Sequence, residues 1–374
     1  MRLQSKMRNF SVCQITILLS LLPSLLSITW INFSFCPKQS SNTLEKIHKN
    51  FVFADMHAHP DKFHRDNISR ISEEELDRYR RGLIDLVVCC VSSDAAYQGG
   101  YTKRNGTLIP RLDIGKYYAL KPGEAFAFTM RRLELVLKTI ELSDVELASN
   151  PSSVMEAKER DKLALMLALE GADGLEGKIE NLFKLHEQGL RLLQLVHFRP
   201  NELGHVQTKP YKAGGLTKFG REVVNECNRL RIIIDLAHAH KQTTMDALEI
   251  SKHPIICSHT GVKALYKDDR YLSDDEIQAI ALAGGIIGIW PSSSFPTMED
   301  MVRHIDYVKK LVGVEHVGIG SDLRGMNYTP EFGEEANFRA IAKAMIKHGY
   351  SDDEVGKVMG SNFFRLWEQI NSEK

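Results

Sequence analysis

The sequence has no excess of charge of either sign. Its 374 residues include 48 lysines and arginines and 48 aspartates and glutamates, so the formal net charge at pH 7 is zero. Surfaces that bind nucleic acid carry a basic excess, which is missing here. We therefore expect no nucleic-acid partner.

Cysteine is scarce, and its spacing gives no disulfide pattern. The chain has six cysteines, namely Cys13, Cys36, Cys89, Cys90, Cys227 and Cys257. Cysteines without paired spacing, lying in apolar segments, are typical of buried thiols that pack as small apolar residues. We expect thiols here and no disulfide framework.

Motifs of two common enzyme classes are also missing. No glycine-rich dinucleotide fingerprint follows the first apolar run, residues 51–57, which argues against a doubly wound nucleotide-binding sheet. The sequence contains no Gly-x-Ser-x-Gly elbow and no evident Ser-His-Asp order. A serine-hydrolase mechanism is therefore not indicated.

Charged residues are absent from residues 10–35, which follow Arg2, Lys6 and Arg8. Cations before an apolar run mark a secretory signal or a signal anchor. The run exceeds the roughly 7 to 15 residues of a signal core, and no small-x-small cleavage site ends it. We expect a leader over residues 1–40, export to the periplasm or exterior, and membrane anchoring as an alternative to cleavage. The remainder, residues 41–374, is predicted to be one domain.

Eight short apolar runs follow the leader, most of them separated by amphipathic, helix-like segments. The runs are residues 51–57, 83–91, 163–169, 190–196, 231–237, 254–258, 285–290 and 316–321. The clearest helical segments are residues 131–147, 219–230, 273–282 and 298–311, and a final helix is expected from Ser351 toward Trp367. Predicted helix caps are Ser72, Thr217, Ser273, Thr297 and Ser351. Eight alternating units predict an α/β fold with a parallel sheet closed into a (β/α)8 TIM barrel.

Polar residues of metal-ligand or acid-base type stand at the ends of these runs. Side chains two apart in a strand share a face, so His57 and His59 can reach one metal ion. Later runs end in Glu170, His197, His238, His259 and Asp322. Because the carboxyl ends of barrel strands meet at one mouth, we expect all seven side chains to converge there. His240 is a rival to His238, and Asp235 is expected to have a structural role.

Imidazoles and a bridging carboxylate can hold two metal ions, which acidify a bridging water and polarise a carbonyl. That chemistry suits the hydrolysis of an amide. Asp322 at the last strand end is placed to act as general acid and base. The alternative is a purely structural role, in which Asp322 caps a helix.

Several motifs together resemble the membrane dipeptidase family (renal dipeptidase, peptidase family M19) of the amidohydrolase superfamily. They are Glu170-Gly171, Thr217-Lys218-Phe219-Gly220, Asn228-Arg229-Leu230, Asp235-Leu236-Ala237-His238, Ser258-His259 and Gly318-Ile319-Gly320-Ser321-Asp322. The resemblance covers about residues 51–370 and implies a dipeptidase with two zinc ions.

The resemblance also implies a role for each site residue. His57 and His59 would hold one zinc ion, and His238 and His259 the other, with Glu170 bridging them. His197 would polarise the scissile carbonyl, Arg270 would bind the substrate carboxylate, and Asp322 would contact the substrate amine and move the proton. The role of Arg270 rests on the resemblance alone.

The sequence departs from the family pattern at His59, where the family usually has aspartate, and at Arg324, where the pattern Asp-Phe-Asp-Gly becomes Asp322-Leu323-Arg324-Gly325. An added cation and a lost carboxylate weaken the prediction of strict dipeptide specificity. The alternatives are a hydrolase of N-acyl amino acids, lactams or other small amides, and a non-catalytic metal-binding surface protein. A homodimer is also considered.

Overall fold

The computed structural model describes residues 38–60, 70–98, 101–104, 107–110, 117–208, 211–292, 294–295, 297–325 and 331–372. Residues 39–374 form one compact unit by contact. Residues 10–35, predicted to be a signal or anchor, lie outside the described residues. Within the described ranges, no helix has the length and apolar character needed to cross a membrane.

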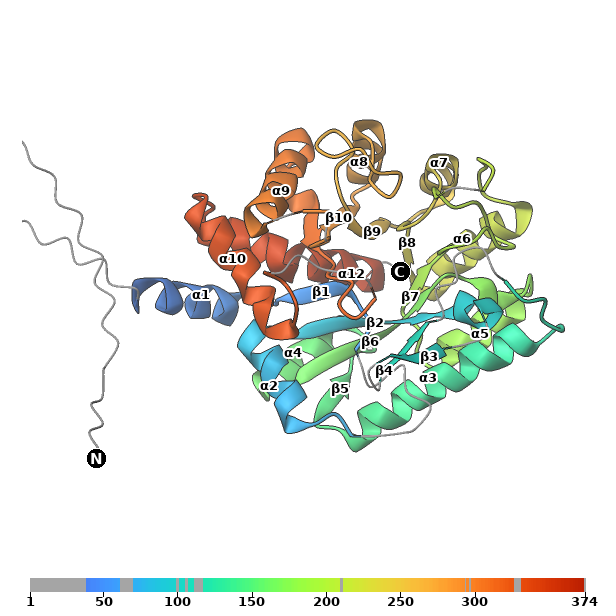
Figure 1. The fold of residues 1–374 in the computed structure, drawn as a ribbon, viewed down its shortest axis with the longest axis horizontal. Coiled ribbons are helices and arrows are strands. Elements are labelled where there is room, and N and C mark those ends of the chain that lie inside the picture. Colours follow the sequence, from blue (N-terminus) through green and yellow to red (C-terminus); the bar gives the residue numbers. More distant parts are fainter. Residues whose placement is uncertain are drawn as a thin grey trace, which may run out of the picture. The chain divides into compact units, whose positions relative to one another are not determined.

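The centre of the compact unit is a barrel of parallel strands with helices around it (Figure 1). Its eight strands follow one another around the barrel in chain order. They are β1 (Ala54–Ala58), β2 (Leu86–Ser92), β6 (Leu163–Glu170), β7 (Leu192–Gln194), β8 (Ile233–Asp235), β9 (Ile256–Thr260), β10 (Ile286–Ile289) and β11 (Val317–Ile319). Each lies in one of the eight predicted runs or overlaps it, so the predicted TIM barrel is confirmed.

The barrel closes between its first and last strands by a few specific bonds. Ala58 forms a parallel bridge with Leu323, just beyond β11. The amide of His59 donates to the Leu323 carbonyl at 2.8 Å, and the amide of Asp322 donates to the His57 carbonyl at 2.8 Å. Closure therefore brings the predicted acid-base residue directly beside the first pair of histidines.

The helices surround the barrel in the order expected of alternating units. They are α1 (Lys38–Asn50), α2 (Glu73–Gly82), α3 (Glu124–Leu142), α4 (Pro151–Glu159), α5 (Ile179–Glu187), α6 (Lys218–Leu230), α7 (Lys241–Ile250), α8 (Asp274–Leu282), α9 (Met298–Val312), α10 (Phe338–Lys347), α11 (Asp352–Gly356) and α12 (Asn362–Ser372). The five predicted caps are confirmed as N-caps: Ser72, Thr217, Ser273, Thr297 and Ser351.

Two helix predictions were wrong in their bounds. The segment predicted as a helix to Leu147 ends as α3 at Leu142, and Val145–Leu147 forms strand β5 on the edge of β6. The final helix is interrupted between α11 and α12, where Gly360 has non-helical backbone angles. A Cβ at Gly360 would collide with the backbone of Ala54, so glycine allows the close approach of this segment to β1.

The segment between β2 and α3 contains a short hairpin. Strands β3 (Tyr101–Arg104) and β4 (Thr107–Pro110) pair antiparallel there.

Apolar side chains fill the barrel below the site. One buried cluster joins inward-facing residues such as Met56, Met166 and Ile286 to Phe363 and Trp367 of α12. The polar strand ends therefore lie above a packed, apolar interior. The described cysteines, Cys89, Cys90, Cys227 and Cys257, are buried and unpaired with one another as expected; Cys13 and Cys36 lie outside the described residues.

Candidate active site

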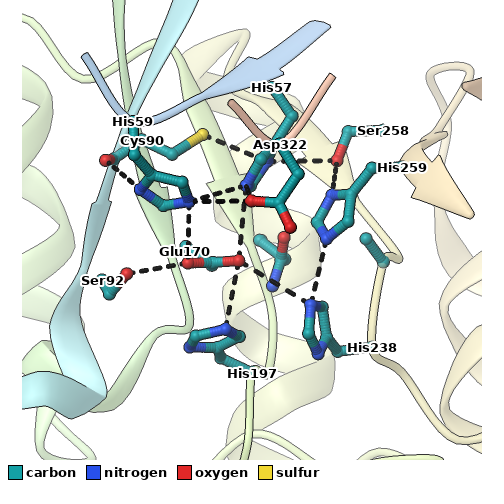
Figure 2. A network of polar contacts seen from close by, with 12 residues as sticks. His57, His59, Cys90, Ser92, Glu170, His197, His238, Ser258, His259 and Asp322 are labelled. Atoms are coloured by element: carbon teal, nitrogen blue, oxygen red, sulfur yellow. Dashed lines mark hydrogen bonds and ion pairs between the residues drawn. The ribbon is translucent and has the colours of Figure 1, made fainter. Parts of the chain in front are cut away.

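The carboxyl ends of the barrel strands carry a cluster of imidazoles and carboxylates (Figure 2). All seven predicted strand-end residues are buried and lie in this cluster: His57, His59, Glu170, His197, His238, His259 and Asp322. The spacing rule for strand ends therefore predicted which side chains meet. Proximity alone does not assign their roles.

Four of the imidazoles face one another in two pairs. Nε2 of His57 lies 3.2 Å from Nε2 of His59, at the end of β1. Nε2 of His238, after β8, lies 3.0 Å from Nε2 of His259, in β9. Burial is the main reason that the pKa values of both His238 and His259 are well below the usual range, and nearby positive charges such as Arg270 add to it. This second pair is therefore neutral at pH 7.

The carboxylate of Glu170 lies between the two pairs. Its Oε1 is 3.3 Å from Nε2 of His57 and 3.7 Å from Nε2 of His238, and its Oε2 is 3.4 Å from Nε2 of His59. Burial raises the pKa of Glu170, but the charges of His197 and His59 outweigh it, and the pKa lies well below its usual value. The Ser92 hydroxyl donates to Oε2 at 2.7 Å. The carboxylate is thus ionised and accessible to both pairs.

This donor set fits divalent metal ions. The Cys90 carbonyl can only accept a hydrogen bond, and Nδ1 of His59 lies 3.1 Å from it, so in the neutral ring Nδ1 carries the proton. The Nε2 lone pair of His59 is then directed into the cluster. Neutral imidazoles beside an ionised carboxylate are the ligands that zinc takes in hydrolytic sites.

Three groups of potential ligand atoms lie within 4.8 Å of one another: His57 with His59 and Glu170, Glu170 with His197 and His238, and His57 with Asp235 and His259. The first group matches the ligand set expected for one metal ion. The second metal ion was expected to be held by His238 and His259 with Glu170. These residues fall into two different groups, because Glu170 lies in a group with His238 but not in one with His259. Glu170 belongs to two groups, as a bridging carboxylate would.

His197, just after β7, is held from both sides of its ring. Its Nδ1 lies 2.9 Å from Oδ1 of Asp94, and its Nε2 lies 3.1 Å from Oε1 of Glu170. Burial lowers the pKa of His197, but the two carboxylates together raise it to about 10. The ring is therefore a hydrogen-bond donor from both nitrogens in this arrangement.

Asp322 lies over the first histidine pair, with Oδ1 3.4 Å from Nε2 of His59 and 3.8 Å from Nε2 of His57. Its backbone is left-handed, with φ of 51°. The preceding residue, Ser321, donates its amide to Oδ1 of Asp55 at 2.8 Å and its hydroxyl to Oδ2. These bonds across the barrel seam fix the carboxylate of Asp322 relative to β1.

Arg270 lies between β9 and α8 and is half-buried against two side chains. Its Nη1 donates to Oε1 of Gln207 at 3.0 Å, and its guanidinium lies 5.4 Å from the ring centre of Trp290. Burial lowers the pKa of the guanidinium from its usual value, which still leaves the group charged at pH 7. The backbone amide of Gln207 donates to the backbone carbonyl of His238 at 2.9 Å, which links Arg270 to the histidine cluster.

Arg324, which departs from the family pattern and was expected to add a positive charge to the site, is paired with a carboxylate. Nη2 of Arg324 lies 3.2 Å from Oε1 of Glu335, and Arg78 lies 2.9 Å from Oε2 of the same carboxylate. Glu335 is 2% exposed, so this pairing is buried on the carboxylate side. The ion pair reduces the positive potential that Arg324 adds to the site.

His240, the rival to His238, lies elsewhere. It is the N-cap of α7, where its side chain accepts a hydrogen bond from the amide of Gln242. Asp235 accepts the amides of Ala237 at 3.0 Å and Ser258 at 2.8 Å, as a structural role requires. It is nevertheless completely buried and lies beside the cluster, within the group containing His57 and His259.

Several residues of the site were not predicted from the sequence: Ser92, Asp94, Gln207, Ser258 and Trp290. Asp94 and Trp290 follow β2 and β10, the two strands for which no site residue was proposed. Because both residues come directly after predicted strands, the same strand-end rule could have identified them from the sequence. Gln207 lies within a long connection and carried no such signal.

Comparison with known proteins gives a consistent assignment. The sequence profile described as "Membrane dipeptidase (Peptidase family M19)" matches residues 42–374. "Dipeptidase tcpJ" of Claviceps purpurea is 30% identical over 255 residues, which are 65% of this chain and 60% of the relative. "Dipeptidase verJ" of Clonostachys rogersoniana is 29% identical over 260 residues, 66% of each. The chain thus aligns with less than two thirds of these relatives' length.

Solved structures share the fold at low sequence identity. The "probable dipeptidase PvdM from Pseudomonas aeruginosa" superposes with a TM-score of 0.73 at 19% identity, over 90% of this chain and 99% of that one. A metallo peptidase from Rhodobacter sphaeroides, solved with a phosphinate mimic of L-Ala-D-Ala, gives 0.71 at 21% identity, over 86% and 99%. With a family profile that spans nearly the whole compact unit, the chain belongs to the membrane dipeptidase family, peptidase family M19.

Proposed function

We propose that the protein is a zinc-dependent dipeptidase that hydrolyses the peptide bond of dipeptides at a binuclear site. The observation that supports this most strongly is the arrangement of the Nε2 atoms of two facing histidine pairs around the buried carboxylate of Glu170. Membership of the family and the dipeptidase names of the relatives support the substrate class.

In this proposal His57 and His59 would hold one zinc ion, and His238 and His259 would hold the other. Glu170 would be the ligand common to both, since its Oε1 lies 3.3 Å from Nε2 of His57 and 3.7 Å from Nε2 of His238. When bound, the two ions supply Lewis acidity toward water and the substrate carbonyl.

The chain's own residues bind the substrate and move the proton. His197 donates from Nε2 to the scissile carbonyl oxygen, and Asp94 holds the opposite ring nitrogen. Asp322 contacts the substrate amine, accepts a proton from the attacking water and delivers it to the leaving nitrogen. Arg270 binds the substrate carboxylate, and Gln207 and Trp290 fix the plane of its guanidinium.

A second candidate function is the hydrolysis of N-acyl amino acids, lactams or other small amides. His59, in place of the family's aspartate, removes a negative charge close to Asp322, where a substrate amine would bind. A site with fewer anions tolerates a neutral acyl nitrogen better than a site built for an ammonium group. Pairing of Arg324 with Glu335 weakens the other argument for this candidate.

Metal analysis of the purified protein, combined with a substrate panel, tests these functions. We expect two zinc ions per chain and turnover of free dipeptides, including those with a D-residue at the C-terminal position. Faster turnover of N-acylated substrates than of free dipeptides would favour the second candidate. Two bound zinc ions with no hydrolysis across a broad amide panel would indicate a non-catalytic metal-binding protein.

We propose further that the protein is exported and that residues 10–35 either direct export or retain it at the membrane. The support is the charge pattern of the leader. Fractionation of cells into cytosol, periplasm or medium, and membrane tests this, and recovery in the cytosol alone would contradict it. Light scattering after size-exclusion chromatography tests whether the protein forms the homodimer considered from the sequence.

A further inference from the structure

We propose that Ser258 is a positioning residue shared by the two metal sites. Its hydroxyl holds the outer nitrogens of His57 and His259, two imidazoles assigned to different metal ions. This inference rests on the proposed binuclear site and adds a residue that neither the ligand set nor the catalytic groups include.

The Ser258 hydroxyl lies between the two rings (Figure 2). Its Oγ is 2.9 Å from Nδ1 of His259 and 3.3 Å from Nδ1 of His57. The two rings are in contact, with centres 4.0 Å apart. Ser258 and His57 are 201 positions apart in the sequence, so the barrel brings this contact together from β9 and β1.

Hydrogen-bond accounting explains why a hydroxyl suits this position. A neutral imidazole that binds a metal through Nε2 must carry its proton on Nδ1 and needs an acceptor there. A serine oxygen has two lone pairs and one proton, so it can accept from both rings at once.

The backbone holds this hydroxyl in place. The amide of Ser258 donates to Oδ1 of Asp235 at 2.8 Å. Gly288 and Gly320 pack against its carbonyl so closely that a Cβ at either position would overlap with it. Ser258 is completely buried. A side chain fixed by backbone bonds and tight packing can impose a direction on the two rings that it touches.

The two rings differ in how far they depend on Ser258. Sγ of Cys90 lies 3.2 Å from Nδ1 of His57 and offers a second, weaker acceptor. Among the described residues, Ser258 is the hydrogen-bond partner found for Nδ1 of His259. Cys90→Ala therefore provides a matched control, because it removes a contact to the first ligand pair only.

The test measures zinc binding of Ser258→Ala, Cys90→Ala and the wild type by competition with a chelator of known affinity. We expect Ser258→Ala to weaken both zinc sites by about 10- to 100-fold, the usual effect of losing a partner of a metal-bound imidazole. Cys90→Ala should weaken at most one site. Thermal unfolding of the metal-free proteins shows whether each variant is folded before zinc is added.

The outcomes separate this inference from the proposed function. If the wild type does not bind two zinc ions, the binuclear site itself is wrong. If the wild type binds two and Ser258→Ala weakens one site or neither, the shared role of Ser258 is wrong. Ser258→Cys, with similar shape and a weaker acceptor, should show an intermediate loss at both sites, and it decides the matter if the alanine variant does not fold.

Discussion

Oδ1 of Asp94 lies 2.9 Å from Nδ1 of His197, although the two residues are 103 positions apart. Asp94 follows β2 in a short 3-10 helix (Ser93–Gln98), and His197 follows β7. The carboxylate fixes the proton on Nδ1 and directs Nε2 toward Glu170, 3.1 Å away. In the proposed reaction, the same contact aims the ring at the scissile carbonyl oxygen and stabilises its positive charge.

Asp94→Asn should lower kcat by about 10- to 100-fold and leave KM nearly unchanged, because the amide keeps an acceptor for Nδ1 but removes the negative charge. Asp94→Ala, which also removes the acceptor, should lower kcat further. Steady-state kinetics on a dipeptide measure both. Asp144→Asn, at a partly exposed ion pair with Lys162, is the matched control. A change confined to KM would contradict the proposed role.

Asp322→Asn should lower turnover by about 100- to 10,000-fold, the usual contribution of a positioned proton-transfer group. Zinc content should stay the same, because the proposed ligands are other residues. Turnover and metal content measured on the same preparation test this prediction. An enzyme with unchanged dipeptide turnover would exclude Asp322 as the group that moves the proton.

His59→Asp restores the carboxylate usual in the family and should make folding more dependent on zinc. Glu170 and Asp322 each lie 3.4 Å from Nε2 of His59, so a third carboxylate nearby repels them until a cation binds. The variant also removes the donor to the Cys90 carbonyl, which costs about 1–3 kcal/mol if that group is left unpaired.

Thermal unfolding with and without zinc measures the effect. The metal-free variant should melt below the metal-free wild type, and the increase on adding zinc should be larger in the variant. Equal increases would show that the charge at this position does not control the first metal site.

The order of the barrel strands and the site residues at their ends could be predicted because both follow from short-range patterns. Apolar runs identify strands, and a parallel barrel places all their carboxyl ends at one mouth. His57 and Asp322 were therefore predictable without knowing that β1 and β11 meet. Bonds such as that of the Asp322 amide to the His57 carbonyl follow from the closure itself.

Contacts between connections could not be predicted in the same way. Asp94 meets His197 only because two connections, after β2 and after β7, lie side by side, and Arg324 meets Glu335 only through the path of the connection after β11. Asp94, Arg324 and Glu335, each taken alone, are compatible with a solvated charge. The strand β5 was missed for a different reason: Val145–Leu147 is too short to show a period, and its pairing with β6 decides its conformation.

His304 of α9 is a buried histidine outside the cluster of imidazoles and carboxylates at the strand ends. Its Nδ1 accepts the amide of Val262 at 3.0 Å, its ring stacks on Phe295 with centres 3.9 Å apart, and it is 4% exposed. Burial, with a smaller contribution from Arg303, lowers its pKa from 6.5 to about 4. The folded protein therefore binds this proton less readily than the unfolded chain does.

Stability from the neutral ring should be fully present above pH 6.5 and should be lost as the pH falls toward 4, because the unfolded chain takes up the proton first. The loss is at most about 3 kcal/mol. In His304→Asn, the amide oxygen can still accept from Val262 but does not titrate. Urea unfolding of metal-free protein at pH 7.5 and 4.5 should show the wild type losing about 2 to 3 kcal/mol more than the variant. His348 is exposed, so His348→Asn is the control, and its loss of unfolding free energy should equal that of the wild type. Equal losses in the wild type and in His304→Asn would show that His304 takes up its proton as readily in the folded protein as in the unfolded chain.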